Sequence, residues 1–239
     1  MAELLRTERL TKNFRGLVAN ENIDFVLGTG DIRCVIGPNG AGKTTFISMI
    51  SGHVAPSSGT IRFRERDITR LSVDKRAKAG IARKFQTPTL FDHLTVYQNL
   101  EIAALGKPST KADRENRIEQ VLEITRLARF CDDSAATLSH GQRQWLEVGM
   151  LLSNRAELLL LDEPTAGMTA EETHATVDLL HMLASTLGLS MVIIEHDMNF
   201  IRELKVPVTV FHLGRVLVHG SFEEIAGNEL VRDAYLGHA

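Results

Sequence analysis

Short apolar segments separated by glycine turns come first along the chain. Residues 1–30 alternate apolar and polar positions and end at a turn that contains Gly28 and Gly30, which predicts antiparallel strands. The apolar segment 32–36 then leads directly into a glycine-rich loop, and residues 43–50 after the loop have the spacing of a helix. The sequence therefore predicts the order strand, loop, helix in this region.

The pattern becomes helical in the middle of the chain. After two further predicted strands at 60–63 and 81–85, helical spacing covers three segments, 96–105, 112–127 and 142–152. We expect residues 94–152 to form a helical lobe inserted into an α/β core that consists of residues 1–93 and 153–239.

Apolar strands return in the last third of the chain. They are predicted at 158–161, 191–194 and 208–212, with a long helix at 170–187. This alternation favours a parallel sheet. The pairs Thr169 with Glu172 and Ser221 with Glu224 have the spacing of a capping box, so they predict two helix starts.

Composition adds few constraints. The 239 residues carry a net charge of -3 with both signs interspersed, so no global field favours nucleic acid as a partner. The apolar runs are far shorter than the roughly 20 residues that span a bilayer. The two cysteines, Cys34 and Cys131, are far apart and predict reduced thiols in a cytosolic compartment.

The glycine-rich loop fits the phosphate-loop pattern. Its eight positions are Gly37, Pro38, Asn39, Gly40, Ala41, Gly42, Lys43 and Thr44. Glycines allow backbone N–H groups to curl around phosphate oxygens at the start of a helix. Lys43 would reach the β and γ phosphates, Thr44 would ligate Mg²⁺, and Thr45 could add a phosphate contact. The loop predicts a nucleotide such as ATP, with Mg²⁺.

Two adjacent carboxylates end the apolar segment 158–161. Asp162 and Glu163 lie on opposite sides of an extended chain, so they can have different roles. Asp162 suits binding of Mg²⁺, and Glu163 suits polarisation of the water that attacks the γ-phosphate. The alternative, a solvated acidic turn, is less favoured beside a phosphate loop.

A third motif makes the resemblance specific. The residues Leu138, Ser139, His140, Gly141 and Gln142 are similar to the LSGGQ signature of ABC ATPases, and they precede the acidic strand as that family requires. The resemblance covers essentially the whole chain. It implies the ABC ATPase fold, which is an α/β phosphate-loop NTPase core with a mostly parallel sheet, an N-terminal antiparallel β subdomain and an inserted helical subdomain.

The resemblance also implies roles for single residues. Phe14 would stack on adenine, Gln86 would contact the metal and the attacking water, and His196 would hold the γ-phosphate and Glu163. The signature residues Ser139, His140, Gly141 and Gln142 would bind ATP that is held by a partner subunit. Each of these positions is weak evidence for the family when taken alone. The occurrence of all of them in the order that the family has is much stronger evidence.

Two positions depart from the family pattern. His140 replaces the first glycine of the signature pair and would place a side chain near the partner's γ-phosphate. Thr169 stands where the family usually has aspartate, so that carboxylate contact across a dimer is not carried over.

The resemblance favours an ABC importer subunit of the urea or branched-chain amino-acid uptake group, nearest the urea type. Expected partners are membrane permeases, a second ABC ATPase chain, identical or not, and indirectly a substrate-binding protein. This places the chain on the inner face of the cell membrane. Residues 85–105 would dock a permease helix, although burial in a core is the more frequent fate of such residues. The alternative functions are an ABC ATPase for lipid or polysaccharide export, an ABC-type ATPase that acts on DNA or the ribosome, and an ATP-binding regulatory module without turnover.

Overall fold

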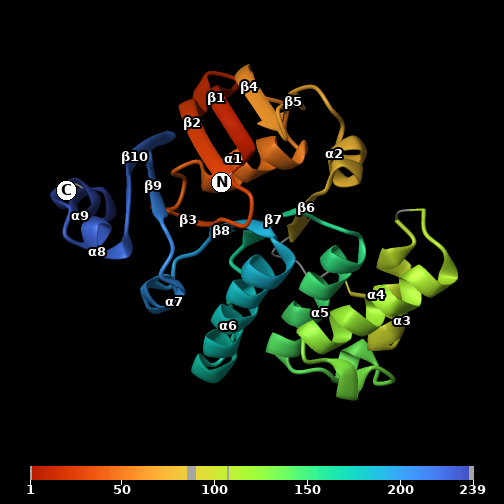
Figure 1. The fold of residues 1–239 in the computed structure, drawn as a ribbon. Coiled ribbons are helices and arrows are strands. Elements are labelled where there is room, and N and C mark those ends of the chain that lie inside the picture. Colours follow the sequence, from red (N-terminus) through yellow and green to blue (C-terminus); the bar gives the residue numbers. More distant parts are fainter. Residues whose placement is uncertain (1, 85–89, 107, 237–239) are drawn as a thin grey trace.

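Two sheets with one helix between them form the core of the protein (Figure 1). The computed structural model describes residues 2–84, 90–106 and 108–236. The first sheet is antiparallel, with strand order β2-β1-β4-β5. Its strands are β1 (Glu3–Phe14), β2 (Leu17–Gly28), β4 (Ser58–Phe63) and β5 (Arg66–Asp67). Arg15 and Gly16 both have positive φ, which matches the tight hairpin turn between β1 and β2.

The second sheet has the order β10-β9-β3-β8-β7-β6. It consists of β3 (Ile32–Ile36), β6 (Ile81–Lys84), β7 (Leu158–Asp162), β8 (Ser190–Ile194), β9 (Val208–His212) and β10 (Arg215–Gly220). All neighbouring strands are parallel except β10, which is antiparallel to β9. The predicted mostly parallel sheet is confirmed, and β10 is an edge strand that the apolar pattern did not predict.

Helix α1 (Lys43–Ser51) fills the space between the two sheets. Its residue Phe46 is fully buried, and its ring centroid lies 5.2 Å from that of Phe25 on β2 and 5.2 Å from that of Phe211 on β9. Val35, Leu158 and related residues of the parallel sheet face the same apolar cluster. The parallel strands are continuously apolar because helices cover their other face as well.

The remaining helices form the lobe and cover that other face, except α2 (Val73–Ala79), which lies on the side of α1 and contacts α1 and β6 (Figure 1). The others are α3 (Val96–Ala104), α4 (Lys111–Ile124), α5 (His140–Ser153), α6 (Ala170–Leu187), α7 (Met198–Leu204), α8 (Phe222–Ala226) and α9 (Glu229–Leu236). Helices α3, α4 and α5 lie together to one side of the sheets (Figure 1). The three helices predicted there are confirmed, with small shifts at their ends, as are both capping boxes. The lobe boundaries at 94 and 152 stay a prediction.

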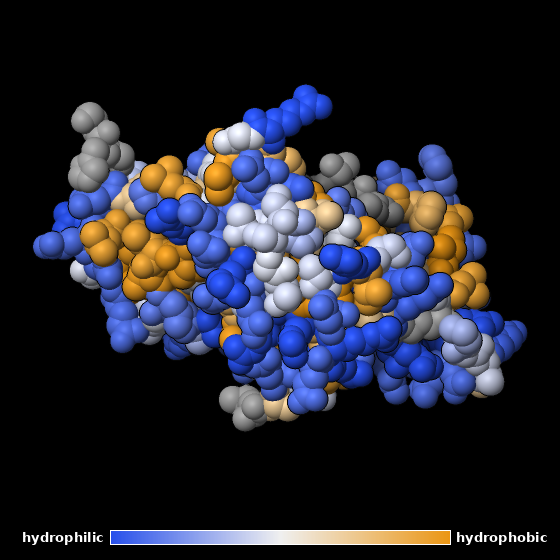
Figure 2. Space-filling model, turned by 90° about the horizontal axis from the view of Figure 1, so that it is seen from above, coloured by the Kyte–Doolittle hydropathy of each residue, from blue (hydrophilic) through white to orange (hydrophobic). Residues whose placement is uncertain are grey.

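The surface on the side of the antiparallel sheet is mainly hydrophilic, with hydrophobic groups in separate patches (Figure 2). Within the described ranges, every helix is too short or too polar to cross a membrane.

A buried ion pair joins the lobe to the parallel sheet. Lys84 Nζ at the end of β6 lies 3.3 Å from Glu147 Oε2 on α5, and the two side chains are only 3% and 4% exposed. Removal of one partner from a buried ion pair is strongly destabilising, because it takes away the main compensation of the other charge.

We predict that Glu147→Ala lowers the free energy of unfolding by about 3–5 kcal/mol, as measured by urea denaturation. Glu115→Ala, which removes an exposed partner of Lys111 on α4, serves as the control and should cost less than about 1 kcal/mol. Replacement of both buried partners, Lys84→Met with Glu147→Leu, should recover most of the loss. Equal stability of Glu147→Ala and the control would contradict this role of the pair.

Candidate nucleotide site

The glycine-rich loop between β3 and α1 is pressed against neighbouring backbone. Gly37 and Gly42 have φ values of 146° and 100°, which favour glycine. A Cβ atom at Gly37 would lie 2.1 Å from the carbonyl oxygen of Phe211, and one at Gly42 would lie 2.4 Å from that of Ala19. Side chains at these two positions would force the loop away from the strands that fix its shape.

The start of α1 is arranged to bind an anion. Its N-cap is Gly42, which supplies no side-chain cap, and the first turn, all of which the structure describes, contains no acidic residue. The first amide N–H groups of a helix have no partner within the helix and carry the positive end of its dipole. Phosphate is the ligand that such a loop and helix start bind best.

Lys43 adds a cation to this loop. Its Nζ donates hydrogen bonds to the carbonyl oxygens of Gly37 at 2.6 Å and Pro38 at 3.0 Å, so the side chain arches over the loop. Burial lowers the pKa of Lys43, and the nearby carboxylates Asp162 and Glu163 oppose that shift. The ammonium group and the carboxylates therefore face a common space.

That space is a cavity of about 420 Å³. It is lined by Phe14, Leu17, Val18, Ala19, Asn39, Gly40, Ala41, Gly42, Lys43, Thr44, Thr45, Asp162, Glu163, Ile194 and His196. The fold thus brings the phosphate loop, both acids, His196 and the aromatic Phe14 together. A larger hollow of about 880 Å³ is lined by residues 55–60, 67 and 69–71 and by none of the predicted site residues, so we place the chemistry in the smaller one.

Asp162 has the properties of a metal ligand. Its side chain is 2% exposed, and its Oδ2 lies 3.5 Å from Nη2 of Arg83. Its Oδ1 is buried and has no hydrogen-bond partner within the described ranges. Burial raises the pKa of Asp162, while Arg83 opposes the shift. Sequence reasoning did not single out Arg83, a charged residue inside an apolar strand.

These residues fit Mg²⁺. The unpartnered oxygen of Asp162 and the exposed residue Thr44 line the same cavity. No group of three or more His, Cys, Asp or Glu side chains suited to a metal occurs in residues 2–84, 90–106 or 108–236. Mg²⁺ commonly binds through one or two protein oxygens plus phosphate oxygens and water, so a nucleotide would complete this site.

Glu163 projects from a strained backbone at the end of β7. Its φ of 50° lies in the left-handed region, which a non-glycine residue adopts at a cost of about 1–3 kcal/mol. Its Oε1 lies 3.3 Å from Nε2 of His196, which follows β8. The two side chains are each about one-third exposed, so solvent reaches them. A carboxylate and an imidazole in contact suit proton handling around an attacking water.

Glu195 holds this pair in place and was missed in the sequence. Its buried carboxylate accepts hydrogen bonds from Thr165 N at 3.1 Å, from Thr165 Oγ1 at 2.5 Å and from His196 N at 3.0 Å. It therefore links the backbone that follows Glu163 to the backbone of His196. A charged residue at the end of an apolar strand, directly before a candidate histidine, is the signal that could have identified it.

The aromatic candidate lies at the rim of the cavity. Phe14 ends β1, is 43% exposed, and has Nζ of Lys12 at 4.7 Å from its ring centroid. An exposed ring face next to a phosphate site can stack on a base. The predicted contact with adenine stays a proposal. Gln86 lies outside the described residues, so its predicted role in the metal site also stays a prediction.

The signature residues lie elsewhere. Ser139 caps α5 and forms a capping box with Gln142, and none of the residues 139–142 lines the 420 Å³ cavity. Within one chain, the structure therefore does not bring the signature to the phosphate loop. The His140 side chain is turned toward its own chain, with Nε2 at 2.8 Å from the carbonyl oxygen of Ala166. The expected position of His140 near a partner's γ-phosphate involves a second chain and stays a prediction.

Comparison with known proteins shows to which family of phosphate-loop proteins the chain belongs. The family described as ABC transporter matches residues 20–166. The chain belongs to the ABC transporter family.

Relatives and solved structures of ABC transporters extend the match to the full length. The high-affinity branched-chain amino acid transport ATP-binding protein BraF of Pseudomonas aeruginosa is 34% identical, and the match covers 99% of this chain and 98% of that protein. The lipopolysaccharide export system ATP-binding protein LptB of Acidithiobacillus ferridurans is 32% identical over 237 residues, with 99% and 98% covered. A crystal structure of the ADP conformation of an ATP-binding cassette has a TM-score of 0.91 at 27% identity and covers 100% of both chains.

This ABC ATPase binds ATP with Mg²⁺ and hydrolyses it, as the motifs predicted. The predicted fold class is confirmed by the cassette structures. The resemblance to the branched-chain amino-acid group is also confirmed. Membership of a transporter family makes permease subunits and a second ATP-binding subunit its partners.

We predict that Glu195→Ala lowers kcat by about 10- to 100-fold with little change in the Kd for ATP, because it releases Glu163 and His196 from their geometry without touching the phosphate loop. Steady-state hydrolysis and equilibrium nucleotide binding would measure the two quantities. Glu195→Gln, which keeps one acceptor oxygen, should lose less activity. A rise in Kd with unchanged kcat would show that Glu195 does not act through this pair.

Proposed function

We propose that this ABC ATPase powers an importer for branched-chain amino acids or a small amide such as urea. The observation that carries the proposal is the full-length similarity to proteins named for branched-chain amino acid transport, among them BraF. The residues 138–152 and 163–169 resemble the same uptake group, nearest the urea type. The permease and the binding protein would select the cargo.

Two chains would form each hydrolysis site. The phosphate loop, Asp162 and Glu163 line one cavity, while Ser139 and Gly141 lie outside it. A second chain can supply these signature donors to the open side of the cavity. Closure of two chains on two ATP molecules would therefore complete both sites at once, and a single chain would bind ATP but hydrolyse it poorly.

Each residue of the cavity has a distinct task in this proposal. The N–H groups of the loop and Lys43 hold the phosphates, and Glu163 polarises the attacking water. His196 orients Glu163 through the 3.3 Å contact and can bond the γ-phosphate. Mg²⁺, held by Thr44 and Asp162, would neutralise charge that develops on the phosphate oxygens.

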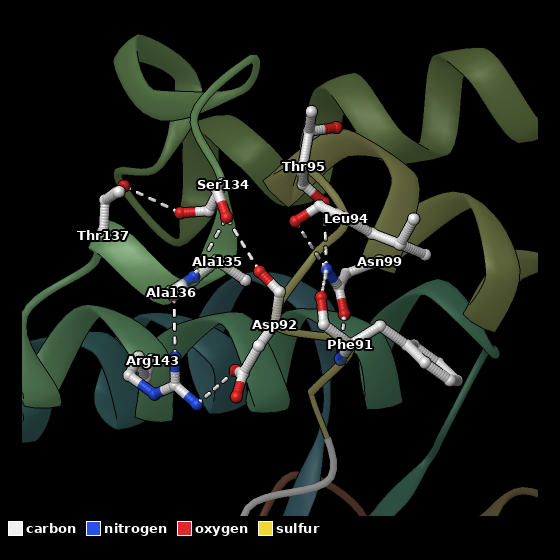
Figure 3. A network of polar contacts seen from close by, with 10 residues as sticks. All are labelled: Phe91, Asp92, Leu94, Thr95, Asn99, Ser134, Ala135, Ala136, Thr137 and Arg143. Carbon is white, nitrogen blue, oxygen red and sulfur yellow. Dashed lines mark hydrogen bonds and ion pairs between the residues drawn. The ribbon is translucent and has the colours of Figure 1, made fainter.

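A network beside the signature can connect the site to a permease (Figure 3). Phe91 is 49% exposed, and its backbone N–H donates to the buried Asn99 at 2.9 Å. The next residue, Asp92, accepts a 2.6 Å hydrogen bond from Arg143, one turn after Ser139 on α5. A membrane helix that contacts Phe91 would thus act on the start of α5 through few bonds. Val96 and Leu100 of the expected docking segment are buried instead.

Permease partners would hold this ABC ATPase at the inner face of the cell membrane, as a peripheral subunit on the cytoplasmic side. A substrate-binding protein would contact the permeases from the opposite side and would not touch this chain.

Export is the second candidate function. The similarity to LptB is almost as high as that to BraF, at 32% against 34% identity. The site residues serve ATP binding and hydrolysis, which can drive transport in either direction. The cargo and its direction must therefore be determined by transport measurements.

We predict that Glu163→Gln lowers ATP turnover by about 10²- to 10⁴-fold, the loss expected for a general base. ATP binding should persist, and ATP should trap two chains as a stable pair that sedimentation detects. Glu171→Gln, an equal change of charge at the exposed start of α6, is the matched control and should keep normal turnover. Undiminished hydrolysis by Glu163→Gln would remove this residue from the role.

We predict that cells in which Glu163→Gln replaces the natural chain lose uptake of labelled leucine or of labelled urea. Cells with the Glu171→Gln chain should keep that uptake. Normal uptake of both compounds, together with loss of a surface lipid or polysaccharide, would favour export and contradict the importer.

A further inference from the structure

An internal carboxylate occupies the donors of the signature loop. Glu172 Oε1 on α6 accepts a hydrogen bond from Ser139 Oγ at 2.9 Å and from the backbone N–H of Gly141 at 3.2 Å. A Cβ atom at Gly141 would lie 2.6 Å from this oxygen, so glycine is what permits the close approach. The signature donors are therefore engaged within the chain.

The other oxygen of the same carboxylate caps α6. Glu172 Oε2 accepts from the backbone N–H of Thr169 at 3.0 Å and from its hydroxyl at 3.2 Å. These bonds, first the one from the Thr169 backbone, lower the pKa of Glu172, so it carries its negative charge at neutral pH. A full charge with four donors is held firmly in this position.

A second contact ties the same two segments together. His140 Nε2 lies 2.8 Å from the carbonyl oxygen of Ala166, and a Cβ atom at Gly167 would lie only 3.2 Å from that ring nitrogen. Ala166 N in turn donates to the carbonyl oxygen of Glu163 at 3.3 Å. The signature loop is thus attached to the segment that follows Glu163.

We propose that Glu172 is a latch on the signature loop, whose carboxylate must leave Ser139 and Gly141 before these groups can bind the partner's ATP. The proposal rests on the shared site proposed above. A carboxylate and a phosphate are both anions and need the same hydroxyl and N–H, so both cannot occupy them at once. Glu172 would therefore raise the ATP concentration at which two chains close.

A groove beside the latch gives the displaced side chain a place to go. It measures about 630 Å³, and Glu172 lines it together with Arg126, Arg129 and Trp145 and with two further acids, Glu123 and Glu171. The two arginines offset the charge of these acids, so the groove can receive the Glu172 carboxylate once a phosphate takes over the signature donors.

The test is ATP-driven pairing of chains that carry Glu163→Gln, followed by sedimentation across an ATP titration. Glu163→Gln with Glu172→Gln should pair at an ATP concentration about tenfold lower than Glu163→Gln alone, because an amide competes with phosphate more weakly than a carboxylate does. Glu163→Gln with Glu171→Gln, the neighbouring acid on α6, is the matched control and should need as much ATP as Glu163→Gln alone.

A second control addresses the helix cap. Thr169→Ala removes one of the four donors to Glu172 but leaves the bonds from Ser139 and Gly141, so it should lower the ATP requirement much less than Glu172→Gln does. Suppose that Glu163→Gln with Glu172→Gln needs as much ATP for pairing as Glu163→Gln with Glu171→Gln. The latch would then be overturned, while the shared site would stand. If Glu163→Gln alone does not pair at saturating ATP, the shared site itself is overturned.

Discussion

The burial of α1 between the two sheets is the constraint on which the site depends. Phe46 packs against Phe25 of one sheet and Phe211 of the other, and this fixes where α1 begins. The loop before it must then pass so close to neighbouring carbonyl groups that glycine is required at Gly37 and Gly42. Packing of an apolar helix thereby orients a set of backbone donors toward a phosphate.

The parallel sheet supplies the reactive groups because the carboxyl ends of its strands meet at one edge. β7 delivers Asp162 and Glu163, and β8 delivers Glu195 and His196 to the same edge. The left-handed backbone at Glu163 and the bonds of Glu195 aim these groups at the cavity. The signature, at the start of α5, lies outside this cavity, which is the basis of our proposal that a second chain completes the site.

Much of this was predictable from sequence because it follows from local patterns. Apolar strands, helix caps and the phosphate loop are encoded by neighbouring residues, and the elements that were predicted occur in the predicted order. The short elements β5, α2, α7 and α9 were not predicted. Edge strand β10 was missed because it is half-exposed and lacks a continuous apolar run. Sequence patterns did not predict the contacts of three charged residues, Arg83, Glu195 and Glu172. Each of them contacts residues that only the fold brings near. The orientation of His140 depended on Ala166, which lies 26 positions away.

Hydrolysis by a mixture of two variant chains tests the shared site most directly. Lys43→Ala removes the phosphate loop cation, and Ser139→Arg blocks the signature. A shared site predicts that each chain alone is nearly inactive. An equal mixture regains activity below that of the unchanged chain, because a mixed pair has one intact Lys43 facing one intact Ser139. Full activity of the Ser139→Arg chain alone would contradict the shared site.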